Sequence, residues 1–441
     1  MGMVVKNNMS AISTLNTLNK NSNALTKSLQ KVSSGMKINS AADDASGYAI
    51  SERMRVQIRG LDQANANTQS GNSMMKVAEG AVSSTVDILK TLKEKVINAA
   101  NDTNTDSDRQ TIQKELDQSI DQIDDNANVT FNGKYLVDGS HNNKVTATKT
   151  ALTNESMSST TASASKLTAL KNRNGEDLNI HSTDNVTVSY VQQGKTYTTT
   201  FQVGSNTLSQ VIASVSSAKN GQEVGKAVLT LSSTTAYIGQ SSSTNSVYTA
   251  DNGNAITLTA ATAGTIGQVS GFSISITDNT GAINKSANAV LDNFSESIRA
   301  QNDSEDNALV LQVGTKANQA IKVGLTDMRS NALGLKGTDG QTLNVSTQAK
   351  ANAAINVLDN ALQKALDQQT TIGSVESRLE YTSSNLTTAS ENVQSSESTI
   401  RDANMAKEMT EYTKNNVLMQ AAQSMLAQAN QSSSSVLSLL Q

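Results

Sequence analysis

Apolar residues recur at a fixed spacing along the C-terminal part of the chain. They occupy successive seven-residue steps: Leu358, Ala365, Ile372, Leu379, Leu386, Val393 and Ile400. A stripe held over six heptads predicts a long helix with a narrow buried seam. At ~1.5 Å per residue, a helix from about 348 to 402 would extend roughly 80 Å, which is too long for one compact domain.

A second set of apolar positions upstream can supply partners for this helix. Steps of three and four join Met75, Ala78, Val82, Thr85, Leu89, Leu92, Val96 and Ala99. After a polar break at 101–106, Ser107 and Gln110 have the spacing of a capping box and should open a shorter helix that ends near Asn128. Its apolar face would be Ile112, Leu116, Ile120 and Ile123. Together these helices predict an elongated antiparallel bundle.

Both extreme ends carry thinner stripes of the same kind. The stripes are Leu15, Leu18, Ser22, Leu25, Leu29 and Val32 at one end, and Met405, Met409, Tyr412, Asn416 and Met419 at the other. Residues 1–60 have a net charge of +5 and residues 391–441 one of −2, so the two ends should attract. Because exposed ion pairs contribute only ~0–1 kcal/mol each, helix packing should dominate. We expect termini that are disordered in the monomer and order on assembly; docking of a terminal helix on its own chain is the alternative.

The middle of the chain, residues 141–305 (called the insert below), is rich in Ser, Thr, Asn and Gly and alternates with the period of strands. The segments 186–191 and 197–203 predict a hairpin around Gln192–Lys195, and a short helix should span 208–217 after a cap at Thr207. Further strands are expected at 227–231, 255–260 and 271–277, and a second hairpin at 309–313 and 321–325. The predicted fold is mainly α, with a β-rich or α+β domain inserted into a rod-like bundle and with coiled-coil-like termini.

Composition excludes several classes of function. The chain of 441 residues has no Cys, two His and a net charge of −4. Disulfides, thiolate metal sites and sulfur nucleophiles are therefore excluded, and bulk charge does not indicate nucleic acid or membrane. Neither a secretory signal nor an 18-residue apolar stretch is present. The chain would then be cytosolic, or exported by a machine that reads no cleavable signal.

Three segments resemble bacterial flagellins. The run Leu29–Gly47 with Arg59-Gly60-Leu61 is similar to the signature near the start of that family, and Phe131-Asn132-Gly133 to the motif that closes its N-terminal helical region. The tail, 420–430 and 436–440, resembles the family's C-terminus. The hook–filament junction protein of the same superfamily usually has Pro after the Asp-Asp pair, whereas Ala45 follows here, which favours flagellin.

The resemblance implies a secreted structural subunit of the bacterial flagellum, without cofactors or enzymatic activity, that builds the extracellular filament for motility. It implies three regions: paired terminal helices in the filament core (1–42 and 401–441), a helical bundle with a hairpin (43–140 and 306–400), and an outer domain (141–305). The implied partners are copies of the chain, the type III export apparatus, a secretion chaperone at the C-terminal helix, and the filament cap and hook-junction proteins. Nucleic acid and membrane insertion are not implied.

Candidate self-assembly residues follow from the terminal stripes and the tail. They are Leu15, Leu18, Leu25, Leu29, Val32, Met405, Met409, Met419, Leu426, Leu437 and Leu440. The predicted bundle seam consists of Val82, Leu89, Val96, Leu358, Ile372, Leu379, Leu386, Val393 and Ile400.

Catalytic, cofactor and metal sites are not predicted. Asp43-Asp44 could serve acid–base chemistry or a metal, but at the start of a helix the pair is better explained by the helix dipole. His141 and His181, 40 residues apart, are expected at the surface of the insert. Basic residues at 53, 55 and 59 should meet acidic groups of a neighbouring subunit, and the Ser/Thr-rich stretch 156–165 is either an O-glycan acceptor or a plain loop.

The family resemblance also implies contact with a flagellin-sensing toll-like receptor through an Arg, a Leu and a Glu. The matching positions here are Thr91, Lys95 and Glu115, so only the Glu is kept. Without the Arg there is no bidentate pairing, and a Lys in an apolar contact must keep its charge solvated. We therefore expect weak receptor binding. Two alternatives to a filament subunit stay open: a junction protein of the superfamily, and an adhesin or glycan-binding protein that acts through 141–305.

Overall fold

The computed structural model describes residues 8–216, 230–232, 236–250 and 253–439. It divides the chain into two compact units. The first unit comprises Met1–Thr68, Gln312–Gln319 and Tyr381–Gln441. The second comprises Gln69–Leu311 and Ala320–Glu380. Two long helices, α2 (Ala45–Ala100) and α6 (Gln348–Arg401), contribute to both.

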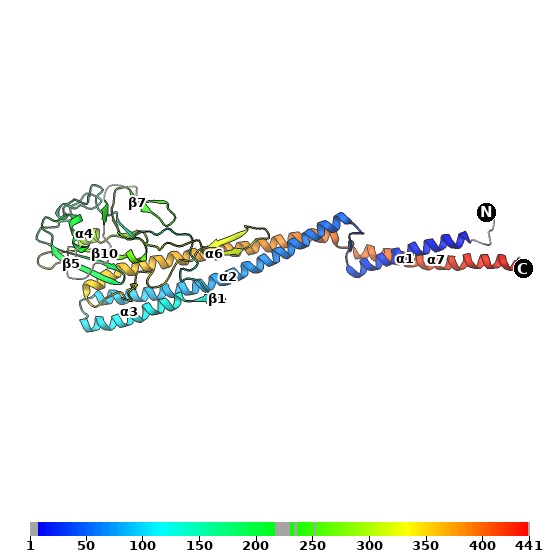
Figure 1. Ribbon diagram of the computed structural model, residues 1–441, viewed down its shortest axis with the longest axis horizontal. Coiled ribbons are helices and arrows are strands. Elements are labelled where there is room, and N and C mark those ends of the chain that lie inside the picture. Colours follow the sequence, from blue (N-terminus) through cyan, green and yellow to red (C-terminus); the bar gives the residue numbers. More distant parts are fainter. Residues whose placement is uncertain (1–7, 217–229, 233–235, 251–252, 440–441) are drawn as a thin grey trace. The chain divides into compact units, whose positions relative to one another are not determined.

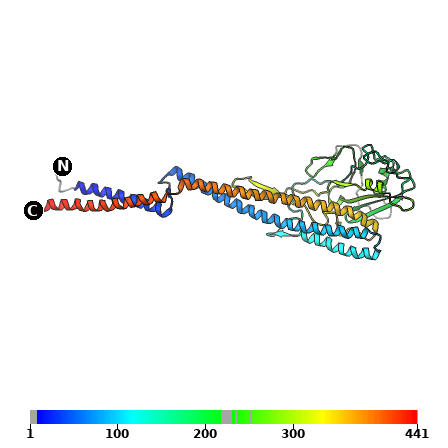
Figure 2. The same ribbon diagram turned by 180° about the vertical axis from the view of Figure 1, so that it is seen from behind.

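The first unit contains α1 (Met9–Ser34) and α7 (Met405–Leu439), which lie side by side in both views (Figures 1 and 2). The N-terminal part of α2 and the C-terminal part of α6 form a second pair in this unit. Hydrogen bonds join the two helices of that pair: Ser383 Oγ donates to Asn65 Oδ1 at 2.6 Å, and Ser390 Oγ donates to Asp62 Oδ1 at 3.0 Å.

The helices of the first unit begin and end at recognisable signals. The Asn8 side chain accepts the amide of Ala11 at the start of α1, and Gly35 ends it at φ +71°, which favours glycine. Asp44 Oδ1 accepts the amides of Ser46 and Gly47 at the start of α2, each at 3.0 Å. The helix-start interpretation is thus confirmed for Asp44, whereas the Asp43 carboxylate accepts the amides of Asn39 and Ser40 in the preceding turn.

In the second unit, α2 runs beside α6 and beside α3 (Asp106–Ala127) (Figure 1). Lys93 Nζ lies 2.5 Å from Asp359 Oδ1, which joins α2 to α6. The apolar faces of the three helices are fully buried at Val82, Leu116 and Leu358, among other positions. The long C-terminal helix was predicted within one residue of its ends.

One detail of α3 corrects the sequence analysis. The capping box was expected at Ser107 and Gln110, but Thr105 and Asp108 form it: the Thr105 hydroxyl accepts the Asp108 amide, and the Asp108 carboxylate accepts the Thr105 amide. Both pairs have the same spacing. Thr105 is selected because its own backbone is extended, as an N-cap residue requires, and a carboxylate accepts more strongly than an amide.

The insert is built of β structure. One sheet has the strand order β10-β4-β5, and a second has β11-β3-β9-β6, while β7 and β8 pair with each other. The bounds of these strands are β3 Ala151–Asn154, β4 Asn185–Gln192, β5 Lys195–Gln202, β6 Thr230–Ser232, β7 Tyr237–Gln240, β8 Ser246–Tyr248, β9 Ile256–Thr259, β10 Val269–Thr277 and β11 Ser295–Ile298. Their shared core includes Tyr190 and Phe272, both almost fully buried.

Short helices and hairpins complete the described chain. They are α4 Leu208–Ser216, α5 Lys285–Leu291, the single 3-10 turns η1 Leu167–Ala169 and η2 Thr265–Gly267, and the hairpins of β1 Thr130–Phe131 with β2 Lys134–Tyr135 and of β12 Leu309–Gln312 with β13 Ala320–Val323. Gln193 and Gly194 turn the predicted β4–β5 hairpin with positive φ at both residues, as a type I′ turn requires. Thr207 caps α4 as expected.

The insert rests on α6 within the second unit. Asn356 and Asn360, one turn apart on α6, donate from Nδ2 to the carbonyls of Phe272 (3.0 Å) and Ser270 (2.8 Å) on β10. Between these contacts a Cβ on Gly271 would come within 2.7 Å of the Val357 side chain. Glycine therefore permits this close approach of strand and helix.

The predicted fold class, mainly helical with long paired helices and a central β-rich insert, is confirmed (Figure 1). Most of the strand expected at 227–231 lies outside the described residues; its end, and the strands expected at 255–260 and 271–277, correspond to β6, β9 and β10. Across the described part of the chain, none of the helices has both the length and the apolar character to cross a membrane.

Candidate assembly surfaces of the paired helices

The terminal helices α1 and α7 pair antiparallel through side-chain amides. Asn8 Nδ2 donates to the carbonyl of Ala429 (3.1 Å), and Asn21 Nδ2 donates to that of Leu418 (3.2 Å). The partner residue number falls as the α1 number rises, which defines the antiparallel direction. Both side chains therefore bind the backbone of the other helix.

Little apolar side chain is buried between these two helices. Besides Ala422, the buried positions on the described parts of α1 and α7 are polar: Ser28, which accepts from Asn415 Nδ2 at 3.0 Å, and Glu408, which is 3.9 Å from Lys31. An interface of this kind stabilises a helix pair weakly, because burial of apolar area is the dominant favourable contribution in helix packing.

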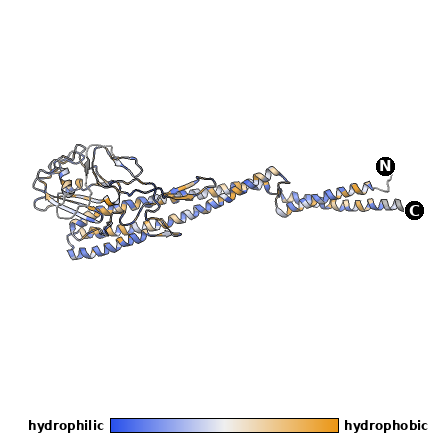
Figure 3. Ribbon diagram, viewed as in Figure 1, coloured by the Kyte–Doolittle hydropathy of each residue, from blue (hydrophilic) through white to orange (hydrophobic). Residues whose placement is uncertain are grey.

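Large apolar side chains are exposed along the same pair. Met9, Val417 and Met425 have exposed fractions of 69%, 59% and 62%. Figure 3 shows hydrophobic residues interspersed with hydrophilic ones along both helices. The remaining exposed members are Ile12, Leu15, Leu29, Met405, Met409 and Leu418. We call these nine residues the terminal apolar surface.

The predicted self-assembly residues divide into three groups. Those in the terminal apolar surface are Leu15, Leu29, Met405 and Met409, and those partly buried are Leu18, Leu25, Val32, Met419 and Leu426. Leu437 lies in α7, and Leu440 lies outside the described residues. The sequence analysis missed Met9, Ile12, Val417, Leu418 and Met425. It followed one stripe per helix, whereas large apolar residues off that stripe would have indicated a second face.

The breaks between helices are held together by backbone bonds. The Lys37 amide donates to the carbonyl of Arg401 (2.8 Å), and the Ala403 amide donates to that of Gly35 (2.9 Å). Arg401 is buried, its Nη1 lies 2.7 Å from Glu52 Oε1, and its guanidinium lies over the Tyr48 ring at 5.6 Å. The hydrogen bond from Arg401 lowers the pKa of the Glu52 carboxyl. The joint of α1 with α2 is thus tied to the joint of α6 with α7.

The seam positions differ between the two units. In the second unit, Val82, Leu89, Val96, Leu358, Ile372 and Leu379 are fully buried. In the first unit, Leu386, Val393 and Ile400 are only half-buried. The same heptad stripe is therefore covered by its own chain in one unit and only partly covered in the other.

The positions matching the receptor motif lie on α2 and α3. Thr91 is exposed, and its hydroxyl donates to the Asp87 carbonyl of its own helix (3.0 Å). Lys95 Nζ lies 3.1 Å from Glu115 Oε1, and both side chains are about half exposed. Glu115, the one position at which the motif is matched, is thus paired with Lys95.

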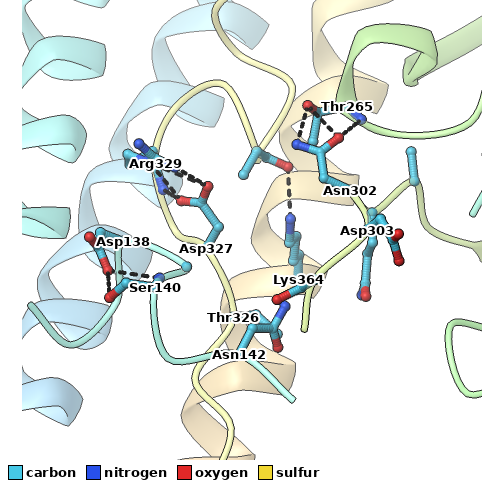
Figure 4. A pocket seen from close by; sticks show the side chains of 15 residues that line it. Asp138, Ser140, Asn142, Thr265, Asn302, Asp303, Thr326, Asp327, Arg329 and Lys364 are labelled. Atoms are coloured by element: carbon cyan, nitrogen blue, oxygen red, sulfur yellow. Dashed lines mark hydrogen bonds and ion pairs between the residues drawn. The ribbon is translucent and has the colours of Figure 1, made fainter. Parts of the chain in front are cut away.

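Charged side chains that could take part in catalysis are held in ion pairs and hydrogen bonds within the chain. A polar cavity of about 350 Å³ in the second unit is lined by charged residues (Figure 4). There Arg329 makes a two-point ion pair with Asp327, and Lys364 Nζ donates to the Ala332 carbonyl at 2.8 Å. No group of three or more His, Asp or Glu within the described ranges could hold a metal ion.

His181 is exposed, as expected, and His141 is half-exposed, its Nδ1 3.2 Å from the Asn307 carbonyl. Arg55, expected to meet a neighbouring subunit, pairs with Glu52 of its own helix at 3.2 Å.

Both ends of the chain match family models. Residues 5–142 match the bacterial flagellin N-terminal helical region, and residues 355–440 match the bacterial flagellin C-terminal helical region. These segments contain α1, α2, α3, α7 and most of α6. The helices that carry the exposed and half-buried apolar positions therefore lie within the two regions that match family models.

Relatives match over nearly the whole length. Flagellin of Clostridium tyrobutyricum is 34% identical over 97% of this chain and 99% of its own, and flagellin of Bacillus subtilis (strain 168) is 30% identical over 99% and 100%. A solved structure, FliC of Burkholderia pseudomallei, aligns with 70% of this chain and 99% of its own at 16% identity and a TM-score of 0.25. By its full-length relatives the chain belongs to the bacterial flagellins, non-enzymatic structural subunits that polymerise into the extracellular flagellar filament that drives motility.

Proposed function

We propose that α1 and α7 make the subunit-to-subunit contacts of the filament through the terminal apolar surface. The observation that carries this proposal is the inversion of side-chain polarity on the pair: nine large apolar side chains are exposed, while Ser28 and Glu408 are buried. Exposed apolar surface on this scale marks an interaction site on a soluble protein. Further copies of the same pair would bury it and add the packing free energy that one chain lacks.

The half-buried seam of the first unit also supports contacts between subunits in this part of the chain. Leu386, Val393 and Ile400 continue a stripe that is fully buried up to Leu379. Neighbouring subunits would complete their burial. Residues 1–42 and 401–441 then form the filament core, residues 43–140 with 306–400 form the surrounding bundle, and 141–305 the outer domain. The compact units divide the chain elsewhere, after Thr68 and before Tyr381, and this boundary lies within α2 and α6.

The exposed apolar residues of α7 also offer a binding surface for partners other than copies of the chain. Val417, Leu418 and Met425 would promote premature association in the cell. A secretion chaperone bound to the C-terminal helix would cover them until export through the type III apparatus. The filament cap and the hook-junction proteins would then meet the same helices at the two ends of the filament.

Seeded polymerisation tests the proposed contacts. The double variant Val417→Ser/Met425→Ser should polymerise far more slowly on wild-type seeds and elongate less at equal monomer concentration. The matched control, Lys414→Ser/Gln423→Ser, changes two exposed polar residues of the same helix and should elongate normally. Circular dichroism of each monomer verifies equal helix content. Normal elongation by the apolar-to-polar variant would contradict the proposal.

A further inference from the structure

A second pocket lies on the insert, remote in sequence from the helices that assemble. It has a volume of about 450 Å³, within the ~300–1,000 Å³ range of small-molecule sites. Residues of β3, β11 and the β7–β8 hairpin line it. Its apolar side is formed by Ile238 and Val247, which belong to a small cluster with Ala151 and Ile298. The hairpin therefore packs on β3 and β11, and the pocket is set between them.

An exposed aromatic ring borders this pocket. Tyr248 lines it with an exposed fraction of 56%. The ring is held edge-on against Tyr237, with the centroids 5.7 Å apart and an interplanar angle of 65°. Tyr190 and Phe272 of the insert are buried in its core, whereas Tyr237 and Tyr248 are exposed. A held but solvent-facing tyrosine beside a depression offers a flat apolar face together with a hydroxyl.

The pocket beside the ring is also lined by polar side chains, few of which are charged. The Glu155 carboxylate is oriented by the amide of Ala250, which donates to Oε1 at 3.1 Å. The Asn293 side chain is fixed by its bond to Ser156, and Ser295 Oγ donates to the Thr153 carbonyl at 3.3 Å. Among the described residues that line the pocket, Glu155 is the one charged side chain. Hydroxyl, amide and carboxylate groups are thus held in place beside an aromatic face.

We propose that this pocket, bordered by Tyr248 and containing Glu155 and Asn293, binds a neutral carbohydrate. A pyranose presents C–H groups on one face and hydroxyls around its rim, so it stacks on an aromatic ring while its hydroxyls meet carboxylate and amide groups. Glu155 accepts hydrogen bonds from sugar hydroxyls and repels carboxylated or sulfated sugars. The site selects hexoses and N-acetylhexosamines over acidic sugars.

Titration of the full-length monomer with defined trisaccharides tests the site. Saturation-transfer NMR and calorimetry would use mannotriose and chitotriose as neutral probes and sialyllactose as the acidic probe. At least one neutral probe should bind saturably and sialyllactose should not. Tyr248→Ala should weaken binding about tenfold or more, as the loss of a central aromatic contact does, and Tyr248→Phe should keep most of it.

Tyr381→Ala is the matched control, because Tyr381 is an exposed tyrosine on α6. It should bind the neutral probe like the wild type. The proposal is overturned if neither neutral probe binds, if sialyllactose binds as tightly, or if Tyr248→Ala and Tyr381→Ala have equal effects. All these variants should still polymerise, so the outcome is independent of the proposed filament contacts.

Discussion

Arg299, at the end of β11, lies 2.6 Å from Asp367 of α6, measured from Nη1 to Oδ2. The same guanidinium contacts Glu296 on β11, with 3.3 Å from Nε to Oε2. Lys364, one turn before Asp367 on α6, is buried beside them. Four charged side chains therefore lie where the insert meets α6, and they couple the two through interactions that depend on protonation.

Glu296→Gln should flatten part of the pH dependence of stability. Burial raises the pKa of Glu296 from 4.5 to about 7, although Arg299 and Lys364 act to lower it. Because the folded-state pKa is above the unfolded value, the folded protein binds the proton more tightly. The free energy of unfolding therefore falls as pH rises from about 4.5 to about 7, by roughly a few kcal/mol, and this contribution is constant above that window.

Urea unfolding at pH 5 and pH 8 measures this effect. The wild type should lose stability between the two pH values, and Glu296→Gln should lose less. Part of the fall should remain, because desolvation also raises the pKa of Asp292 to about 6, which acts in the same direction. Glu305→Gln, an exposed neighbour, serves as the control. An equal pH dependence in wild type and Glu296→Gln would refute the interpretation.

Leu379→Asp should unfold the seam at the end of the second unit. Leu379 is fully buried, and an unpaired carboxylate there costs on the order of 3–5 kcal/mol. Tyr381→Asp, two residues along the same helix, is the comparison, because Tyr381 is 74% exposed and should change stability by less than ~1 kcal/mol. Chemical denaturation of both monomers gives the difference. Equal midpoints for the two variants would be inconsistent with the seam.

Gly271→Val should separate the insert from α6. The added side chain would come within 2.7 Å of Val357 and 3.0 Å of its backbone nitrogen, so β10 would have to shift. The hydrogen bonds from the side chains of Asn356 and Asn360 to β10 would then lengthen or break, at a cost of about 1–3 kcal/mol. Hydrogen exchange at 269–277 should become faster. Gly80→Val on α2, where a Cβ meets no atom within 4 Å, is a control for loss of glycine itself.

The helical part of the fold could be predicted from sequence, because its signal is local and repeated. One heptad stripe defined α6, and the step pattern from Met75 to Ala99 lies entirely within α2. The β4–β5 hairpin was predicted for the same reason, since its turn residues are adjacent in the chain. The pairing of β10 with β4 was not, because it joins strands about 80 residues apart and depends on the shared core.

The surfaces were harder to predict than the elements. A three-to-four spacing indicates which helix face is apolar, but not whether the same chain or another copy covers it. Leu29 and Leu379 lie on equally regular stripes, yet Leu29 is 50% exposed and Leu379 is fully buried. Contacts such as that of Gly271 with Val357 depend on tertiary placement and leave no periodic signal. The pocket beside Tyr248 likewise leaves no periodic signal, since three separate segments of the chain build it.

Restoring the receptor motif should raise signalling by the monomer. By the resemblance, Lys95 would stand at the position of the motif's leucine and Thr91 at that of its arginine, and Lys95 pairs with Glu115. In Thr91→Arg/Lys95→Leu the carboxylate of Glu115 loses its lysine partner, and the new guanidinium supplies a fork for two-point pairing. The change also removes a charge that an apolar contact would have to desolvate.

The double variant should therefore lower the half-maximal concentration in a toll-like receptor reporter assay by about tenfold or more. Each single substitution should recover less than the pair, because Thr91→Arg alone leaves Glu115 paired with Lys95, and Lys95→Leu alone supplies no guanidinium. Lys90→Leu, a change of the same chemistry at a neighbouring exposed position of α2, should leave the wild-type response unchanged. If wild-type protein already signals at nanomolar concentration, the weak-binding prediction fails. If instead the double variant signals like Lys90→Leu, the three positions on α2 and α3 do not form the receptor contact in this chain.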